Sequence, residues 1–128
     1  MTQTEVSTKR ILVIDDEDLL TRSLKNLLKK SGYEPFIARN GEEGEAIAAQ
    51  EDLDVIISDI RMPGKNGVDT IKAIRAGSRN QTTPVIFITG FADSDIECEA
   101  NRLKPLAYFS KPFDSGDLLG VIEYRFSP

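Results

Sequence analysis

Asp59 is the residue of this sequence whose type and position first suggest chemistry. Residues 55–57, Val-Ile-Ile, form an apolar run shortly before it, and Met62-Pro63-Gly64 begins three residues after it. Such a run, ended by a Pro-Gly turn, is typical of a short strand buried on both faces. Open α/β sheets bind ligands at the carboxyl ends of their strands. Taken alone, however, Asp59 is more simply explained as a turn residue.

Other polar residues of the right kind follow further apolar runs. Asp15 and Asp16 come after the first run, Thr89 ends another, and Lys111 follows the last. Each of these residues has a simpler explanation as a helix cap, a strand residue or a solvated charge. Their coincidence at four strand ends favours a common site. The expected strands are residues 10–14, 33–38, 54–58, 84–89 and 106–110.

Helical patterns lie between these strands. The first helix begins in the acidic run at residues 15–18 and ends at Ser31-Gly32, with acids first and bases last. The last helix is expected to begin with Ser115 as its N-cap. The remaining helices are expected at residues 40–51, 67–76 and 94–103, and the last at 115–124. Regular alternation predicts an open, doubly wound α/β fold with five parallel strands in the order 2-1-3-4-5 and helices on both faces.

Length and composition limit the possible functions. The 128 residues carry a net charge of −5, which argues against direct nucleic-acid binding. The sequence has no histidine, which excludes catalysis or metal binding by imidazole, and the single cysteine excludes an internal disulfide. No apolar run approaches the roughly 18–20 residues that cross a bilayer. Residues 1–9 are expected to be a flexible lead-in to one domain, residues 10–128, of a soluble cytoplasmic protein.

The strand order brings the polar residues to one shallow crevice. Asp15, Asp16 and Asp59 would repel one another there unless a proton or a cation is shared. Mg²⁺, or Mn²⁺ in its place, suits such an oxygen-rich site because Mg²⁺ retains several waters. A metal, the Lys111 ammonium and the Thr89 hydroxyl together suit a phosphoryl group, with Asp59 as its nucleophile.

These residues resemble a known family. Ile14-Asp15-Asp16, Asp59 with Met62-Pro63, Thr89-Gly90, and Tyr108 with Lys111-Pro112-Phe113 are similar in order and spacing to the receiver domains of two-component response regulators. The resemblance extends from residue 10 to about residue 126 and implies the flavodoxin-like form of the fold. The sequence departs from the family pattern in two places. Residues 104–107 are Lys-Pro-Leu-Ala where the family usually has a Gly-Ala pair, and the last helix is short.

The resemblance implies specific roles for the site residues. Asp59 would accept a phosphoryl group from a sensor histidine kinase or a phosphotransfer protein. Asp16 and Asp59 would bind Mg²⁺ directly, Asp15 through water, and Arg61 through its backbone carbonyl. Lys111 would pair with the phosphoryl oxygens and precede Pro112 in a cis peptide.

The resemblance also implies a switch that responds to phosphorylation. Thr89 would turn inward to the phosphoryl group, and Tyr108 would follow it from an exposed to a buried position. The output face would comprise helix 94–103, strand 106–110 and helix 115–124, through which the chain would bind a partner, an effector domain or a second copy of itself. Arg61 and Phe91, each two residues past a site residue, would set the phosphoryl lifetime by shielding it from water.

Two alternatives remain at this stage. A receiver-like scaffold would bind partners without phosphorylation, although no acid and no lysine of the site is missing. A phosphatase resembling the haloacid dehalogenase class would need Asp-x-Asp after the first strand, whereas Asp15 and Asp16 are adjacent. The main hypothesis is therefore a signalling module and not a metabolic enzyme, either standing alone or cut from a longer regulator.

Overall fold

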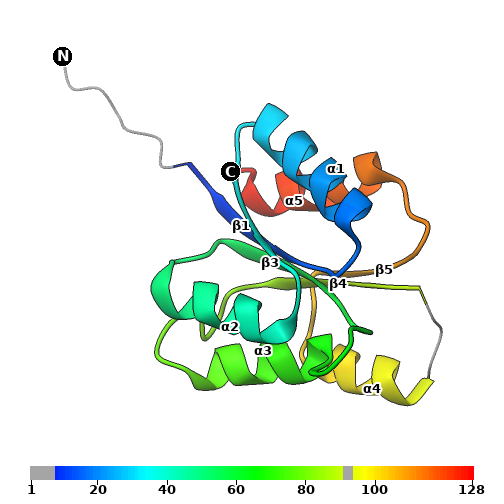
Figure 1. The fold of residues 1–128 in the computed structure, drawn as a ribbon. Coiled ribbons are helices and arrows are strands. Elements are labelled where there is room, and N and C mark those ends of the chain that lie inside the picture. Colours follow the sequence, from blue (N-terminus) through cyan, green and yellow to red (C-terminus); the bar gives the residue numbers. More distant parts are fainter. Residues whose placement is uncertain (1–7, 91–93) are drawn as a thin grey trace.

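Five parallel strands form a single sheet with helices on both faces (Figure 1). The computed structural model describes residues 8–90 and 94–128. The strands are β1 (Arg10–Ile14), β2 (Glu34–Ala38), β3 (Val55–Asp59), β4 (Val85–Thr89) and β5 (Ala107–Ser110). The helices are α1 (Asp18–Lys30), α2 (Gly41–Gln50), α3 (Gly67–Ala76), α4 (Ser94–Arg102) and α5 (Ser115–Phe126).

The strand order is β2-β1-β3-β4-β5, with every neighbouring pair parallel. This confirms the predicted doubly wound topology. Pro35 lies in β2 at one edge of the sheet, where a residue without a backbone N–H costs least. Because the strands are parallel, their carboxyl ends all lie at the same end of the sheet. The polar residues of the predicted site lie at or just after these carboxyl ends in the sequence.

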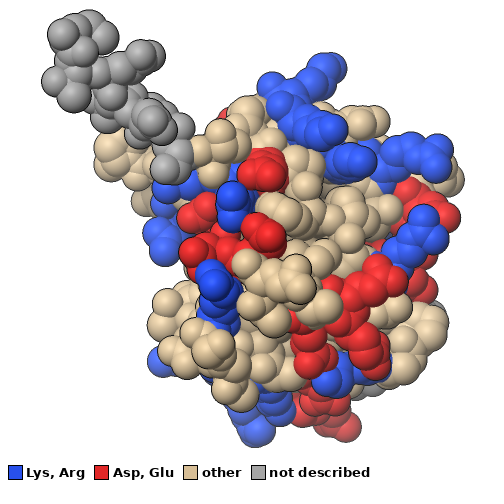
Figure 2. Space-filling view, turned by 60° about the vertical axis from the view of Figure 1, so that its left-hand side comes forward, with Lys and Arg blue, Asp and Glu red and all other residues tan. Residues whose placement is uncertain are grey.

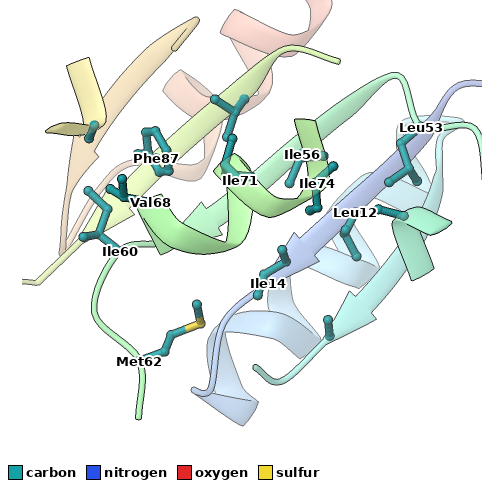
Figure 3. Close-up of a cluster of buried hydrophobic side chains, with 14 residues drawn as sticks. Leu12, Ile14, Leu53, Ile56, Ile60, Met62, Val68, Ile71, Ile74 and Phe87 are labelled. Carbon is teal, nitrogen blue, oxygen red and sulfur yellow. The ribbon is translucent and has the colours of Figure 1, made fainter. Parts of the chain in front are cut away.

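Alternating side chains of the central strands divide the core into two layers. In β1, Leu12 and Ile14 pack toward α2, α3 and α4, whereas Ile11 and Val13 pack toward α1 and α5. Figure 3 shows the first layer, in which α3 lies over the sheet and its Val68, Ile71 and Ile74 join Phe87 of β4. Both faces are covered, so strands that are apolar throughout are the expected sequence pattern.

Helix starts follow from local hydrogen bonds, and two differ from the sequence prediction. The side chain of Asp114 accepts hydrogen bonds from the N–H groups of Gly116 and Asp117, so Asp114 is the N-cap of α5. The prediction of Ser115 as the cap was therefore wrong by one residue. Helix α1 begins at Asp18, so the acids before it belong to the loop after β1.

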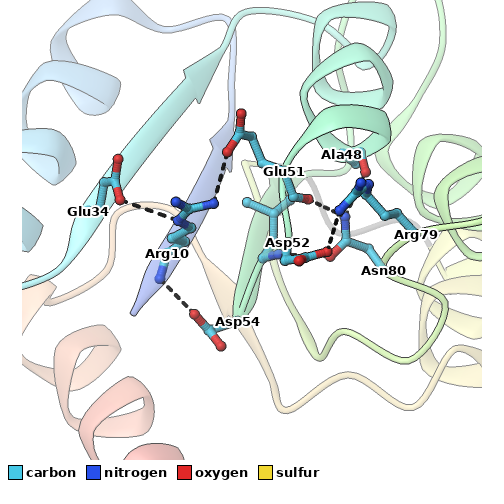
Figure 4. A network of polar contacts seen from close by, with 9 residues as sticks. Arg10, Glu34, Ala48, Glu51, Asp52, Asp54, Arg79 and Asn80 are labelled. Carbon is cyan, nitrogen blue, oxygen red and sulfur yellow. Dashed lines mark hydrogen bonds and ion pairs between the residues drawn. The ribbon is translucent and has the colours of Figure 1, made fainter. Parts of the chain in front are cut away.

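A polar network closes the amino end of the sheet (Figure 4). The Arg10 side chain donates to Glu51 at 2.9 Å, and its backbone N–H donates to Asp54 at 2.8 Å. The Asn80 side-chain amide donates to the carbonyl oxygens of Ala48 and Glu51 at 2.7 and 2.8 Å. These bonds join the loops before β1, β3 and β4, at the end of the sheet opposite the predicted site.

Charged side chains of both signs are interspersed on the face that Figure 2 displays. The net charge of −5 is therefore not gathered there into one acidic surface. Among residues 8–90 and 94–128, no helix combines the length and apolar character that crossing a bilayer requires.

Gly67 allows the start of α3 to lie against the end of β3. Its N–H donates to the carbonyl oxygen of Ile60 at 2.8 Å. A Cβ at this position would lie 2.1 Å from the carbonyl oxygen of Asp59 and 3.0 Å from the Cα of Ile60. Both neighbours are backbone, so a side chain here would displace the segment that carries Asp59.

We therefore expect Gly67→Ala to lower the free energy of unfolding by about 1–3 kcal/mol, the usual cost of overpacking. Gly120→Ala in α5 is the matched control, because a Cβ there meets no atom within 4 Å. The control should raise stability by about 0.5–1 kcal/mol through helix propensity. Urea denaturation of both variants measures the difference, and equal effects would rule out the close approach as the cause.

Candidate functional site

Backbone hydrogen bonds extend the sheet past the strand ends and so fix the candidate residues. The Asp15 N–H donates to the carbonyl oxygen of Ala38 at 3.0 Å, and the Lys111 N–H donates to that of Thr89 at 2.7 Å. Asp59 is the last residue of β3 and is paired with β4. These residues therefore belong to the rigid sheet, although their side chains extend beyond it.

The Lys111 ammonium lies at the centre of the site. Its Nζ lies 3.0 Å from Asp15 Oδ2 and 3.0 Å from Asp59 Oδ2, and it also contacts Glu17 Oε1. The Lys111 side chain is only 17% exposed. The Lys111-Pro112 peptide is cis, as the resemblance implies. The topology thus brings a cation from the end of β5 to carboxylates from β1 and β3.

The carboxylates are held by short-range bonds as well. Asp15 Oδ1 accepts the N–H of Glu17 at 2.8 Å, and Asp59 Oδ1 accepts the N–H of Arg61 at 3.2 Å. One oxygen from each of Asp15, Glu17 and Asp59 lies within 4.8 Å of the others. Asp15 Oδ2 is buried and accepts no hydrogen bond of good geometry, so the Lys111 charge is its main compensation.

Burial and mutual repulsion alter how these groups ionise. Burial raises the pKa of Asp15 above its ordinary value, against the opposing hydrogen bond from the Glu17 N–H. Burial, followed by the charge of Asp15, raises the pKa of Asp59 to about 6, although Lys111 opposes this. Burial would lower the pKa of Lys111, but the three carboxylates close to its ammonium raise it instead. The site therefore holds more negative charge than one ammonium can offset.

The other predicted residues lie around this group. Asp16 is exposed and is not one of the three carboxylates whose oxygens converge. Arg61 is also exposed and contributes its backbone N–H to Asp59. Phe91 falls outside the described residues. The roles predicted for these residues stay predictions.

Thr89 and Tyr108 lie on the far side of the sheet from Asp59. Thr89 is buried and follows Ile88, which packs toward α1 and α5, so strand alternation directs Thr89 toward α3 and α4. Tyr108 is half-buried, is opposite Phe87 in the register, and packs against that same layer. The two residues are diagonal neighbours across β4 and β5.

Glu17 is the site residue that the sequence analysis did not assign. Its position in the acidic run suggested only a helix start. The signal that could have identified it is its spacing from Asp15, because an Asp side chain often accepts the N–H of the second residue after it. That turn directs residue 17 back toward the carboxyl ends of the strands.

Comparison with known proteins gives the class of this protein. A family model described as the response regulator receiver domain matches residues 11–123, which is most of the chain. The chain therefore belongs to the receiver domains of two-component response regulators, which are signalling modules and are not generally classed as enzymes.

Individual relatives agree with this class. The Escherichia coli regulatory protein AtoC is 36% identical over 114 residues, which cover 89% of this chain and 24% of that protein. The Mycobacterium tuberculosis transcriptional regulatory protein PdtaR is 31% identical over 120 residues, covering 93% of this chain and 57% of that protein. Sporulation initiation phosphotransferase F of Bacillus subtilis is 29% identical over 115 residues, covering 90% of this chain and 91% of that protein. This chain thus spans only part of the longer regulators.

The fold also matches solved structures. The Vibrio cholerae chemotaxis protein CheY4 superposes with a TM-score of 0.85 at 28% identity, over 94% of this chain and 100% of that chain. A response regulator receiver protein from Pseudomonas putida superposes with a TM-score of 0.87 at 26% identity, over 94% and 99% of the two chains. These matches confirm the flavodoxin-like fold predicted from the sequence.

A divalent cation fits the residues present. The donors are all carboxylate oxygens, which suit Mg²⁺, and Asp15 Oδ2 is a buried oxygen without a hydrogen bond. Receiver domains typically bind Mg²⁺ at such an acidic cluster. A bound cation would relieve the repulsion that raises the pKa of Asp59.

The raised pKa of Asp59 predicts that the metal-free protein loses stability as the pH rises. Folded Asp59 binds its proton more tightly than unfolded Asp59, so the loss occurs between the ordinary value of 3.8 and about 6. We expect a loss of about 1–3 kcal/mol through this window. Denaturation in a chelator at about pH 4 and about pH 7.5 measures it.

Asp59→Asn should be more stable than wild type at the higher pH and should show a smaller pH dependence, with Asp15 supplying the remainder. Asp54→Asn, at the amino end of the same strand, is the control and should keep the wild-type profile. Identical profiles for wild type and Asp59→Asn would show that Asp59 does not titrate in this window.

Proposed function

We propose that this chain is a phosphoacceptor switch, in which Asp59 receives a phosphoryl group from a sensor histidine kinase or a phosphotransfer protein. The observation that carries this proposal is the position of the Lys111 ammonium, 3.0 Å from both Asp15 Oδ2 and Asp59 Oδ2. A structural ion pair would need one carboxylate, whereas here buried acids exceed cations. Excess acids beside a fixed ammonium suit the transfer of a phosphoryl group in the presence of a divalent ion.

The chemistry requires little from the protein beyond position and charge. A carboxylate oxygen of Asp59 attacks phosphorus in line with the nitrogen of the donor phosphohistidine. The P–O bond forms as the P–N bond breaks, and the electron pair of the broken bond returns to the imidazole nitrogen. Lys111 neutralises charge on the phosphoryl oxygens during and after transfer. Arg61 and Phe91 would then shield the acyl phosphate from water.

Mg²⁺, or Mn²⁺, is the proposed cofactor. Asp16 and Asp59 would bind it directly, Asp15 through water, and Arg61 through its backbone carbonyl. When bound, the ion would neutralise the acids and stabilise negative charge on the phosphoryl oxygens. The converging oxygens of Asp15, Glu17 and Asp59 and the unsatisfied Asp15 Oδ2 support a cation at this place, whereas the parts of Asp16 and Arg61 rest on the family resemblance.

The proposed output involves α4, β5 and α5. A phosphoryl oxygen offers the Thr89 hydroxyl a charge-assisted hydrogen bond that only the modified state provides. Moving Thr89 toward Asp59 would vacate space beside Tyr108, its diagonal neighbour on the same side of the sheet. Phosphorylation would thereby bias how this face binds a partner, an effector domain or a second copy. A cytoplasmic location, where kinase and target meet, is part of the proposal.

Asp59 should take up one phosphoryl group from a small acyl phosphate in the presence of Mg²⁺, because the acids cannot accept a dianion without a cation. Intact-mass measurement follows the reaction. Asp59→Asn or excess chelator should abolish the uptake, and the control Asp54→Asn should retain it. Equal incorporation in wild type and Asp59→Asn would remove Asp59 from its role, and no uptake at all would favour a scaffold that acts without phosphorylation.

Thr89→Ala should separate phosphorylation from its consequences. The variant keeps Asp59 and Lys111 but loses a charge-assisted hydrogen bond of about 1.5–3 kcal/mol. Amide hydrogen exchange with and without beryllium trifluoride as a phosphoryl mimic should change over residues 94–110 in wild type and remain constant in Thr89→Ala. Thr89→Ser, which keeps the hydroxyl, should respond like wild type. Wild-type changes confined to the loop after Asp59 would contradict this route.

A further inference from the structure

Glu17 occupies the N-cap position of α1, but its side chain does not cap the helix. At the starts of α2, α3 and α5, the side chains of Asn40, Asn66 and Asp114 each accept backbone N–H groups of their own helix. The Glu17 carboxylate instead contacts Lys111, 94 residues away in the sequence. Its position therefore reflects the site and not the start of the helix.

Three carboxylates lie around the Lys111 ammonium. An ammonium group has three N–H donors, and Asp15, Glu17 and Asp59 each place an oxygen within ion-pair distance of Nζ. Two of these carboxylates, Glu17 and Asp59, accept hydrogen bonds from Lys111, and Asp15 adds an ion pair without a hydrogen bond. A phosphoryl group on Asp59 therefore has to compete with carboxylates that already surround the ammonium.

Glu17 is the carboxylate best able to leave. The Asp15 side chain is 0% exposed and the Asp59 side chain 5%, whereas that of Glu17 is 57% exposed. Asp15 is also held by the N–H of Glu17, and Asp59 itself carries the phosphoryl group. Glu17 and Lys111 both line an open groove of about 430 Å³, into which the Glu17 side chain can turn. Released there, the Glu17 carboxylate regains water.

We propose that Glu17 competes with the phosphoryl group for Lys111. In the resting protein Glu17 binds the ammonium, and the phosphoryl oxygen displaces it when Asp59 is modified. This inference rests on the proposed function and adds a residue to it. Glu17 thus acts through Lys111 as a positioning residue, and it lowers the affinity of the resting site for anions.

The test is the affinity for beryllium trifluoride in the presence of saturating Mg²⁺, measured by calorimetry. Glu17→Gln keeps the shape of the side chain but removes its charge, and it should bind the anion about three- to tenfold more tightly. In phosphorylation by a small acyl phosphate, the same variant should show a lower KM with kcat little changed. Amide spectra of the free variant check that its fold is intact.

Asp18→Asn is the matched control. Asp18 is an exposed acid one residue further along, paired with Arg39 at 3.7 Å, so its removal changes the local charge equally without touching Lys111. Asp18→Asn should change the affinity by less than about twofold. Equal gains in both variants would assign the effect to the general field and overturn the inference.

The remaining outcomes are equally decisive. Unchanged or weaker anion binding in Glu17→Gln, with normal binding and uptake in wild type, would overturn the competition but leave the phosphoacceptor function standing. A wild-type protein that binds no beryllium trifluoride and takes up no phosphoryl group would overturn both.

Discussion

The attraction between the Lys111 ammonium and the carboxylates at the ends of β1 and β3 is the interaction on which the site depends. Two of these acids, Asp15 and Asp59, are almost entirely buried, and each lies 3.0 Å from the same Nζ. At an effective dielectric constant near 20, two like charges a few ångströms apart repel by roughly 3–4 kcal/mol. One cation cannot cancel this for every pair. Burial and, after it, the remaining repulsion from Asp15 raise the pKa of Asp59, and the excess negative charge suits the site to a further cation.

The two ends of the sheet deal with charge differently. At the amino end, the acids bonded to Arg10 keep contact with water, since the Glu34 and Glu51 side chains are 49% and 34% exposed. At the carboxyl end, Asp15 and Asp59 are withdrawn from water and held by ladder bonds and by the loop N–H groups. Hydrated ion pairs contribute little energy either way, whereas buried excess charge costs stability. This carboxyl end is where doubly wound sheets bind their ligands.

The sequence was sufficient for the strands, the order of the sheet and the convergence of Asp15, Asp59 and Lys111. Buried parallel strands need apolar residues throughout, so they are clear in the pattern, and their polar endings follow from the topology. The N-cap of α5 was misassigned because Asp114 and Ser115 are both good caps, and only the backbone decides between them. Glu17 was missed because its long side chain contacts a residue far away in the sequence. That contact depends on the assembled sheet, and the local spacing from Asp15 indicates only that the loop turns back, not which residue Glu17 meets.

The two layers of the core determine how a change at Asp59 can reach other surfaces. Ile57 and Phe109 pack toward α1 and α5. Asp59 and Lys111 each lie two residues further along the same strand direction, so their side chains belong to the same side of the sheet. Tyr108 belongs to the opposite side, with α3 and α4. In the proposed switch, a signal from Asp59 must therefore cross the sheet, and the end of a strand is the place where it can do so. Thr89 ends β4, opposite Ser110 of β5 and one residue past Ile88, which is opposite Asp59, and we therefore propose it as the crossing point. The phosphoryl group can shift the equilibrium between the two positions of the Thr89 side chain only by the difference between its interaction free energies with them. The charge excess at Lys111 matters here as well, because it determines how strongly the resting site resists the arriving anion.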